Sequence, residues 1–200
     1  MRRIVLLSIT LFSFCWQSGW AQTPFETFDF SLNGSTIIND NALLQNWNPT
    51  EGISIEARSP YYIGELEAGT RFVYYQADQF EGSAFRSIYM FIGWSYPIEL
   101  GERFSVTPGF RIGNHFMWQD EKKEYFGDSG GSPFVFHRNE SQFAYELQVR
   151  TAYSFTERLH IHLSTSYKRS PINIPFEVAY VSVGFARTFS TPGWLRRFVQ

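Results

Sequence analysis

Apolar and polar side chains alternate along the segment 103–118, RFSVTPGFRIGNHFMW. From Phe104 to Trp118 the even positions are apolar, with Asn114 as the exception, and most odd positions carry polar or small side chains. Successive side chains of a strand point to opposite faces, so this pattern predicts a strand with one apolar and one polar face. The segment also exceeds the roughly 9–11 residues that a tilted strand needs to cross a bilayer.

The same alternation recurs along the chain, except that the segment 85–96 is apolar on both faces. The expected strands are 25–37, 51–59, 65–76, 85–96, 103–118, 142–155, 159–169 and 176–189. Their number is even, as a closed single-chain barrel requires. The sequence therefore predicts an all-β fold, an eight-stranded antiparallel up-and-down transmembrane β-barrel.

The connections between these strands alternate in length. Those after the second, fourth and sixth strands are short, including a turn at 97–102. Those after the first and fifth strands are long loops, 39–50 and 119–141, and those after the third and seventh are polar. Outer-membrane barrels have short periplasmic turns and longer outer loops, and this chain has the same asymmetry with both ends periplasmic.

A soluble barrel with the apolar face inside is the alternative interpretation. The apolar face carries large aromatic side chains on nearly every strand. An eight-stranded interior is only just wide enough for side chains to fill, so it does not hold that volume. We therefore expect the apolar face to contact lipid and the polar face to fill the lumen.

Composition and the first residues agree with one exported domain. The chain has 200 residues, a formal net charge of −2 and 19% aromatic residues, without a basic face for nucleic acid. Met1-Arg2-Arg3, the apolar run 4–16 and Ala21 predict a signal peptide over 1–21, ahead of a barrel over 22–189 and a periplasmic tail over 190–200. The only cysteine, Cys15, would leave with the signal peptide, which excludes disulfides and thiolate chemistry in the mature protein.

With these features the chain resembles the small eight-stranded outer-membrane β-barrel proteins of Gram-negative bacteria, of the OmpA membrane domain and OmpX type. The resemblance covers about 25–189. It implies location in the cell outer membrane, lipid and lipopolysaccharide as partners, a monomer, and no cofactor. The family's last strand is read by the barrel-assembly machinery, and the segment 183–189, VGFARTF, resembles that signal. Here a tail follows it, in which Trp194 either rests at the inner interface or belongs to a frayed end.

Two groups of residues are the candidate sites. The first is a set of inward charges of both signs, expected to pair because an isolated buried charge is costly. The second is a pair of aromatic girdles at the two membrane interfaces. The expected lumen charge network is Glu56, Arg58, Glu67, Arg71, Arg111, Glu146, Arg150 and Lys168, and the expected girdles include Trp94, Tyr96, Phe116, Trp118, Phe155 and Tyr167.

Three motifs suggest other chemistry, and none of them persuades us that the protein is an enzyme. The segment 127–133, GDSGGSP, resembles the nucleophile motif of trypsin-like proteases, but a flexible Gly/Ser loop explains it better. His162-Leu163-Ser164, with Glu177 on the next strand, resembles the site of outer-membrane lipid A deacylases. The residues that follow the serine differ from that family, and the pair lies on the polar face. His160 and His162 have metal-compatible spacing, but their strand offers no matching carboxylate, so we expect no metal.

We expect a structural or surface-interaction role through the outer loops, above all 119–141. Two alternatives remain open: a narrow pore for ions or small solutes through the charged lumen, and a lipid-modifying enzyme.

Overall fold

The computed structural model describes residues 24–39, 47–77, 84–119, 139–171 and 176–194. The predicted signal peptide, the protease-like motif and the end of the tail lie outside these residues. Eight long strands dominate the described part of the chain: β1 (Thr27–Ile37), β3 (Gly52–Tyr61), β4 (Gly64–Ala77), β5 (Phe85–Ser95), β7 (Phe104–Gln119), β8 (Asn139–Thr156), β9 (Leu159–Ser170) and β10 (Phe176–Ser190).

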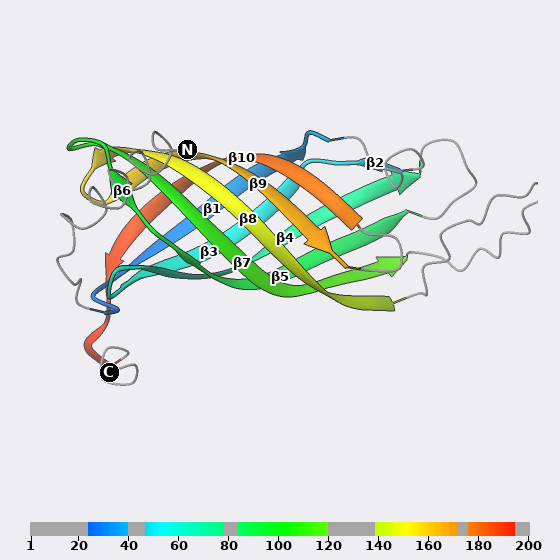
Figure 1. The fold of residues 1–200 in the computed structure, drawn as a ribbon, viewed down its shortest axis with the longest axis horizontal. Helices are drawn as coiled ribbons and strands as arrows, with labels where there is room; N and C mark the ends of the chain where they lie inside the picture. Colours follow the sequence, from blue (N-terminus) through cyan, green and yellow to red (C-terminus); the bar gives the residue numbers. More distant parts are fainter. Residues whose placement is uncertain (1–23, 40–46, 78–83, 120–138, 172–175, 195–200) are drawn as a thin grey trace, which may run out of the picture.

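These strands form a closed antiparallel barrel, which confirms the predicted fold (Figure 1). Around the wall the order is β1-β3-β4-β5-β7-β8-β9-β10, so neighbours along the chain are neighbours in the sheet. The first and last strands close the wall, with Thr27 opposite Ser190 and Ile37 opposite Tyr180. β1 begins and β10 ends at the short-turn end of the barrel, on the left of Figure 1. Among the described residues, no helix has the length and apolar character to cross a bilayer.

Two short strands correct the sequence prediction. The segment 39–50, expected to be a loop, contains β2 (Trp47–Pro49), which pairs with the end of β4. β4 outruns its pairing with β3, so its last residues need another partner, and β2 supplies it. The turn expected at 97–102 contains β6 (Ile98–Glu99), which pairs with the start of β7 and is followed by Gly101 at a φ of 110°.

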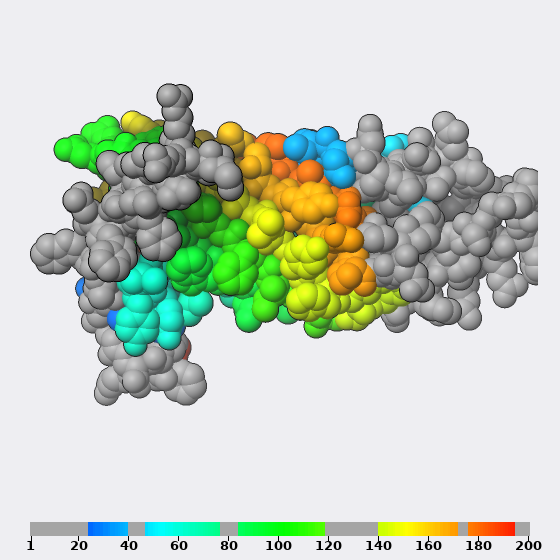
Figure 2. Space-filling model, in the orientation of Figure 1, coloured from blue at the N-terminus to red at the C-terminus, as the bar shows by residue number. Residues whose placement is uncertain are grey.

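The two faces of the wall are divided as the alternation predicts. Large apolar side chains point outward and stay exposed, with Phe30, Leu147 and Phe185 at 51, 60 and 60%. Polar side chains such as Ser31, Ser54 and Arg111 point inward and are nearly inaccessible. Outward side chains of β7, β8 and β9 make up much of the wall visible in Figure 2. A closed wall with an apolar outer surface is the form in which strands cross a bilayer, because it has no unpaired edge.

Candidate functional site in the barrel lumen

All eight charged residues predicted for the lumen lie inside the barrel and are buried. They come from five strands: β3, β4, β7, β8 and β9. Their exposed fractions do not exceed 5%. They are Glu56, Arg58, Glu67, Arg71, Arg111, Glu146, Arg150 and Lys168.

Arg111 lies at the centre of this network. Its Nη1 and Nη2 donate to the two carboxylate oxygens of Glu56, at 3.2 and 2.8 Å, and Nη2 also donates to Glu67 at 3.0 Å. Its guanidinium carbon lies 4.2 Å from the ring centroid of Phe91. Gly93 provides the space, since a Cβ there would lie only 2.8 Å from Arg111 Cγ. One cation therefore holds two carboxylates from neighbouring strands.

Two further arginines extend the network along the lumen. Arg71 donates to Glu146 at 2.9 Å, and its guanidinium carbon lies 4.3 Å from the centroid of the Tyr180 ring. Arg150 donates to Glu65 at 2.8 Å and lies 3.7 Å from Glu67. Hydrogen-bonded pairs of this kind are what a buried charge requires, because desolvation of an unpaired ion is costly.

Lys168 is held differently from the arginines. Its Nζ lies 5.1, 5.2 and 5.7 Å from the ring centroids of Tyr89, Phe176 and Tyr180. Within the described chain no carboxylate oxygen comes within 4.0 Å of it. A cation over several aromatic faces is stabilised by the negative faces of the rings.

Between the charge network and the loop end, the lumen changes from charged to apolar. At the loop end of the strands, seven inward side chains form an apolar cluster that we call the outer plug. The rings of Tyr75 and Phe85 stack with centroids 4.3 Å apart, and Phe176 packs at 6.5 Å from Tyr75. The outer plug consists of Val73, Tyr75, Phe85, Met117, Phe176, Val178 and Tyr180.

The sequence predicts a filled polar lumen; at this end the lumen is filled, but by apolar and aromatic side chains. The signal was present in the sequence, since these side chains occupy inward-facing positions of their strands. Near the loop ends, both the inward-facing and the outward-facing positions of the strands carry apolar residues, and this marks the place where the lumen closes.

The deacylase-like arrangement is not assembled in the structure. His162 is inside the barrel, with Nε2 2.7 Å from Asn33 Oδ1. Glu177, the proposed third member, lies on the outer face, in an ion pair with Arg169 at 3.2 Å. Successive residues of a strand point to opposite faces, and the next residue, Val178, is buried in the lumen. Glu177 therefore points away from the lumen and cannot orient a histidine inside it.

The other two histidines in the described residues, His160 and His115, are also tied to polar neighbours. His160 lies 2.9 Å from Ser154 and 2.9 Å from Thr188, which donates to Asp29 at 2.6 Å. His115 forms a hydrogen bond with Ser87. Within the ranges that the structure describes, no group of three or more His, Cys, Asp or Glu side chains is arranged to hold a metal ion.

Among the described residues at the short-turn mouth, the carboxyl group of Glu99 lies outside the membrane-spanning strands and has a shifted pKa. Partial burial raises the pKa of Glu99, and the nearby carboxylate of Glu65 raises it further.

The predicted girdle residues lie at the two ends of the outer wall. Trp94 packs near Tyr96 at the short-turn end, with ring centroids 6.2 Å apart. Phe116 stacks on Trp118 at the loop end, at 5.8 Å. Phe155 at the short-turn end and Tyr167 at the loop end are 52 and 40% exposed. Aromatic rings at both ends of an apolar wall are the usual arrangement at the two membrane–water interfaces.

The comparisons with known proteins concern this fold. No model of a known protein family matches the sequence. No curated protein matches it either. The solved structure of Neisserial surface protein A aligns with a TM-score of 0.54 and 12% identity, covering 84% of this chain and 100% of that one. This chain is a β-barrel of the outer-membrane type.

Two other outer-membrane-type barrels, both from Pseudomonas aeruginosa, support the same conclusion. Outer membrane protein H aligns with a TM-score of 0.53 and 16% identity, over 82% of this chain and 99% of that one. The N-terminal β-barrel domain of OprF aligns with a TM-score of 0.51 and 11% identity, over 84 and 100%. These likenesses confirm the fold expected from the resemblance to small eight-stranded outer-membrane barrels.

Proposed function

We propose that the protein is a non-conducting integral barrel of the outer membrane, with a structural or surface-interaction role carried by its outer loops. The observation that carries the proposal is the double filling of the lumen. Arg111 and its carboxylate partners occupy the middle, and the outer plug occupies the loop end. An eight-stranded barrel has little interior beyond what its side chains fill, so two filled levels leave the loops as the surface for contacts.

The same reasoning gives the partners that we propose. Lipid and lipopolysaccharide surround the exposed apolar wall, and the barrel-assembly machinery reads the aromatic end of β10, where Phe189 is 48% exposed. The protein acts as a monomer, without a cofactor. Its lumen histidines form hydrogen bonds with interior side chains, and on this basis the protein carries out no lipid hydrolysis.

Conductance in a planar bilayer is the direct test. Folded protein, identified by its heat-dependent shift on a gel, is expected to give no discrete channel steps. Reproducible steps whose size changes in Arg111→Met would overturn the proposal in favour of the narrow pore. Channel steps that are unchanged in Arg111→Met would indicate leakage around the barrel. In that case a heat-unfolded sample should give the same steps.

The role of the loops needs a second experiment in cells. Replacing 120–138 by a short Gly/Ser linker is expected to leave the gel shift and the barrel intact, because β7 ends at Gln119 and β8 begins at Asn139. Resistance of the envelope to detergent is then compared among the strain lacking the protein, the strain with the full chain and the strain with the linker. Full rescue by the linker variant would assign the role to the barrel wall instead of this loop.

A further inference from the structure

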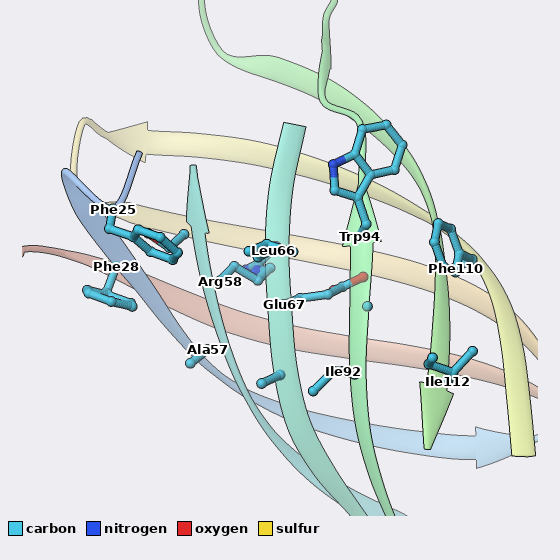
Figure 3. Close-up of a pocket in the computed structure, with 13 residues that line it drawn as sticks. Phe25, Phe28, Ala57, Arg58, Leu66, Glu67, Ile92, Trp94, Phe110 and Ile112 are labelled. Carbon is cyan, nitrogen blue, oxygen red and sulfur yellow. The ribbon is translucent and has the colours of Figure 1, made fainter. Parts of the chain in front are cut away.

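A groove of about 480 Å³ lies on the outer wall of the barrel, in its short-turn half (Figure 3). It runs across β3, β4, β5 and β7. In Figure 3, Phe25 and Phe28 lie at one side, Trp94 and Phe110 at the other, and Ala57 and Ile92 between them. The surrounding wall is the apolar belt described above, so the groove is a hollow in a surface that contacts lipid.

Three small outward residues create this hollow. Ala57 on β3 pairs directly with Ala68 on β4, and Ser59 pairs with Leu66 one step nearer the short turns. The hydroxyl of Ser59 donates to the carbonyl of Thr27 at 2.7 Å, so it is turned to the backbone. The floor of the groove therefore consists mainly of short side chains and strand backbone, to which the neighbouring residues Arg58, Glu67 and Gly93 also contribute. Arg58 and Glu67 belong to the lumen network and are at most 5% exposed.

The rim is built from the large side chains next to these small ones. Ala68 pairs with Ile92, which pairs with Ile112, and Leu66 pairs with Trp94, which pairs with Phe110. The groove thus has one apolar wall on β5 and β7, and Phe25 and Phe28 form the wall on the other side. Its depth comes from the difference in size between the alanine side chains on β3 and β4 and the bulky side chains on β5 and β7.

One end of the groove reaches the membrane interface. Trp94 lies against Gly64, where a Cβ would come within 2.6 Å of the indole ring, so the glycine lets the ring lie close to β4. Tyr96 is beside Trp94, and Phe25 packs against Tyr61 at 5.5 Å. This aromatic girdle marks the level of lipid headgroups at the short-turn side, so the groove runs from headgroup level into the hydrocarbon.

We propose that the groove binds one acyl chain of a phospholipid from the periplasmic leaflet. The groove is continuous with the lipid-facing belt, and an acyl chain needs no hydrogen bonds there. The chain's own tail beyond Trp194 is a poorer occupant, because its backbone N–H and C=O groups would enter hydrocarbon without partners. Lipopolysaccharide belongs to the opposite leaflet, on the loop side of the barrel.

Preference for this place over the rest of the wall comes from packing. Between apolar surfaces in lipid there is no hydrophobic driving force, and association depends on van der Waals contact. A chain on the convex wall touches protein on one side, whereas a chain in the groove touches the floor and both walls. Each extra contact is small and they add, so we expect the first lipid to bind roughly tenfold tighter than the next.

Native mass spectrometry of the folded, detergent-solubilised mature protein, titrated with palmitoyl-oleoyl phosphatidylethanolamine, tests this directly. Wild type is expected to show one lipid bound roughly tenfold tighter than later ones. Ala68→Phe, which fills the groove, is expected to bring the first lipid to the affinity of the rest. Gly34→Phe is the matched control, because it adds the same ring to the outer wall where nothing lies within 4 Å. It should keep the preference.

Each other outcome overturns the proposal in a distinct way. Equal affinities in wild type, or equal effects of the two phenylalanines, would mean that the groove binds no particular chain. A dimer that disappears in Ala68→Phe would assign the groove to a second copy. Tighter lipid binding after deletion of 195–200 would assign it to the tail. If Ala68→Phe loses its heat-dependent gel shift, Ala57→Leu takes its place. Absence of the shift in wild type would instead contradict the membrane barrel itself.

Discussion

The replacement of Arg111 by methionine is the sharpest test of the lumen network. Methionine keeps much of the length of the side chain and removes its charge and its donors. Arg111 makes three hydrogen bonds, two to Glu56 and one to Glu67, and all three residues are at most 5% exposed. The variant therefore leaves two buried carboxylates without their principal partner.

The expected loss follows from these contacts. Removing one member of a buried ion pair typically costs about 3–5 kcal/mol, because the other charge stays buried and uncompensated. Arg111 donates to two carboxylates and lies 3.9 Å from that of Glu146, which argues for the upper part of that range. Arg150, 3.7 Å from Glu67, compensates one of them in part. We expect the free energy of unfolding to fall by about 4 kcal/mol.

Lys168→Met is the matched control. It removes another buried cation, but one whose neighbours are aromatic rings. The lost cation–π attraction, on the order of 2 kcal/mol, is offset by relief of a buried charge, so the net change should stay within about 1 kcal/mol.

Urea unfolding in lipid vesicles measures both variants. Tryptophan fluorescence follows the transition, and the gel shift identifies the folded fraction. Adding Glu56→Gln to Arg111→Met should recover at least about 1 kcal/mol, since one stranded carboxylate is removed. Equal losses for Arg111→Met and Lys168→Met, or a loss below about 1 kcal/mol for Arg111→Met, would refute the reasoning that paired charges, and not mere filling, stabilise the lumen.

Three further predictions concern packing and chemistry. Gly113→Ala should cost about 3 kcal/mol or prevent folding, since its Cβ would overlap the carbonyl oxygen of Met90. Gly34→Ala meets open space and should change stability by less than about 0.5 kcal/mol in the same urea titration. Phe85→Ala removes a fully buried ring of the outer plug and should cost about 3–5 kcal/mol; a loss under about 1 kcal/mol would mean that the plug is loosely packed. Ser164→Ala should leave the mass spectrum of lipid A in expressing cells unchanged, and any shift toward longer or additional acyl chains would revive the deacylase hypothesis.

How much the sequence predicted depends on which property of a strand is asked for. Side-chain direction has a period of two, so the inward positions of Glu56, Arg111 and Glu146 could be predicted from alternation alone. Partners could not, because they depend on the register between strands. Arg111 meets Glu56 from a strand that is not its neighbour in the wall, and no local pattern in either segment indicates that contact.

The groove and the outer plug illustrate the same limit. Ala57 and Ala68 are unremarkable in their own strands and make a hollow only because the register sets them opposite each other. The residues of the outer plug occupy inward-facing positions of the alternation. In the sequence, however, apolar residues at both inward and outward positions look like a strand that is apolar on both faces. β2 was missed for another reason: a strand of three residues is too short to show any period.

The seam between β1 and β10 has a consequence for how the barrel is made. Thr27 and Ser190 stand opposite each other although nearly the whole described chain separates them. Side chains span the seam as well, from Asn33 to His162 and from Asp29 to Thr188. Pairing between strands so far apart in the chain has a large loop-closure entropy cost, so we expect the pairing of β1 with β10 to complete assembly. Until then the sheet has two open edges, to which other chains can add. A chain whose synthesis stops before β10 would lack the strand that closes the barrel. The fifteen residues of β10 therefore decide whether this protein forms a barrel or an aggregate.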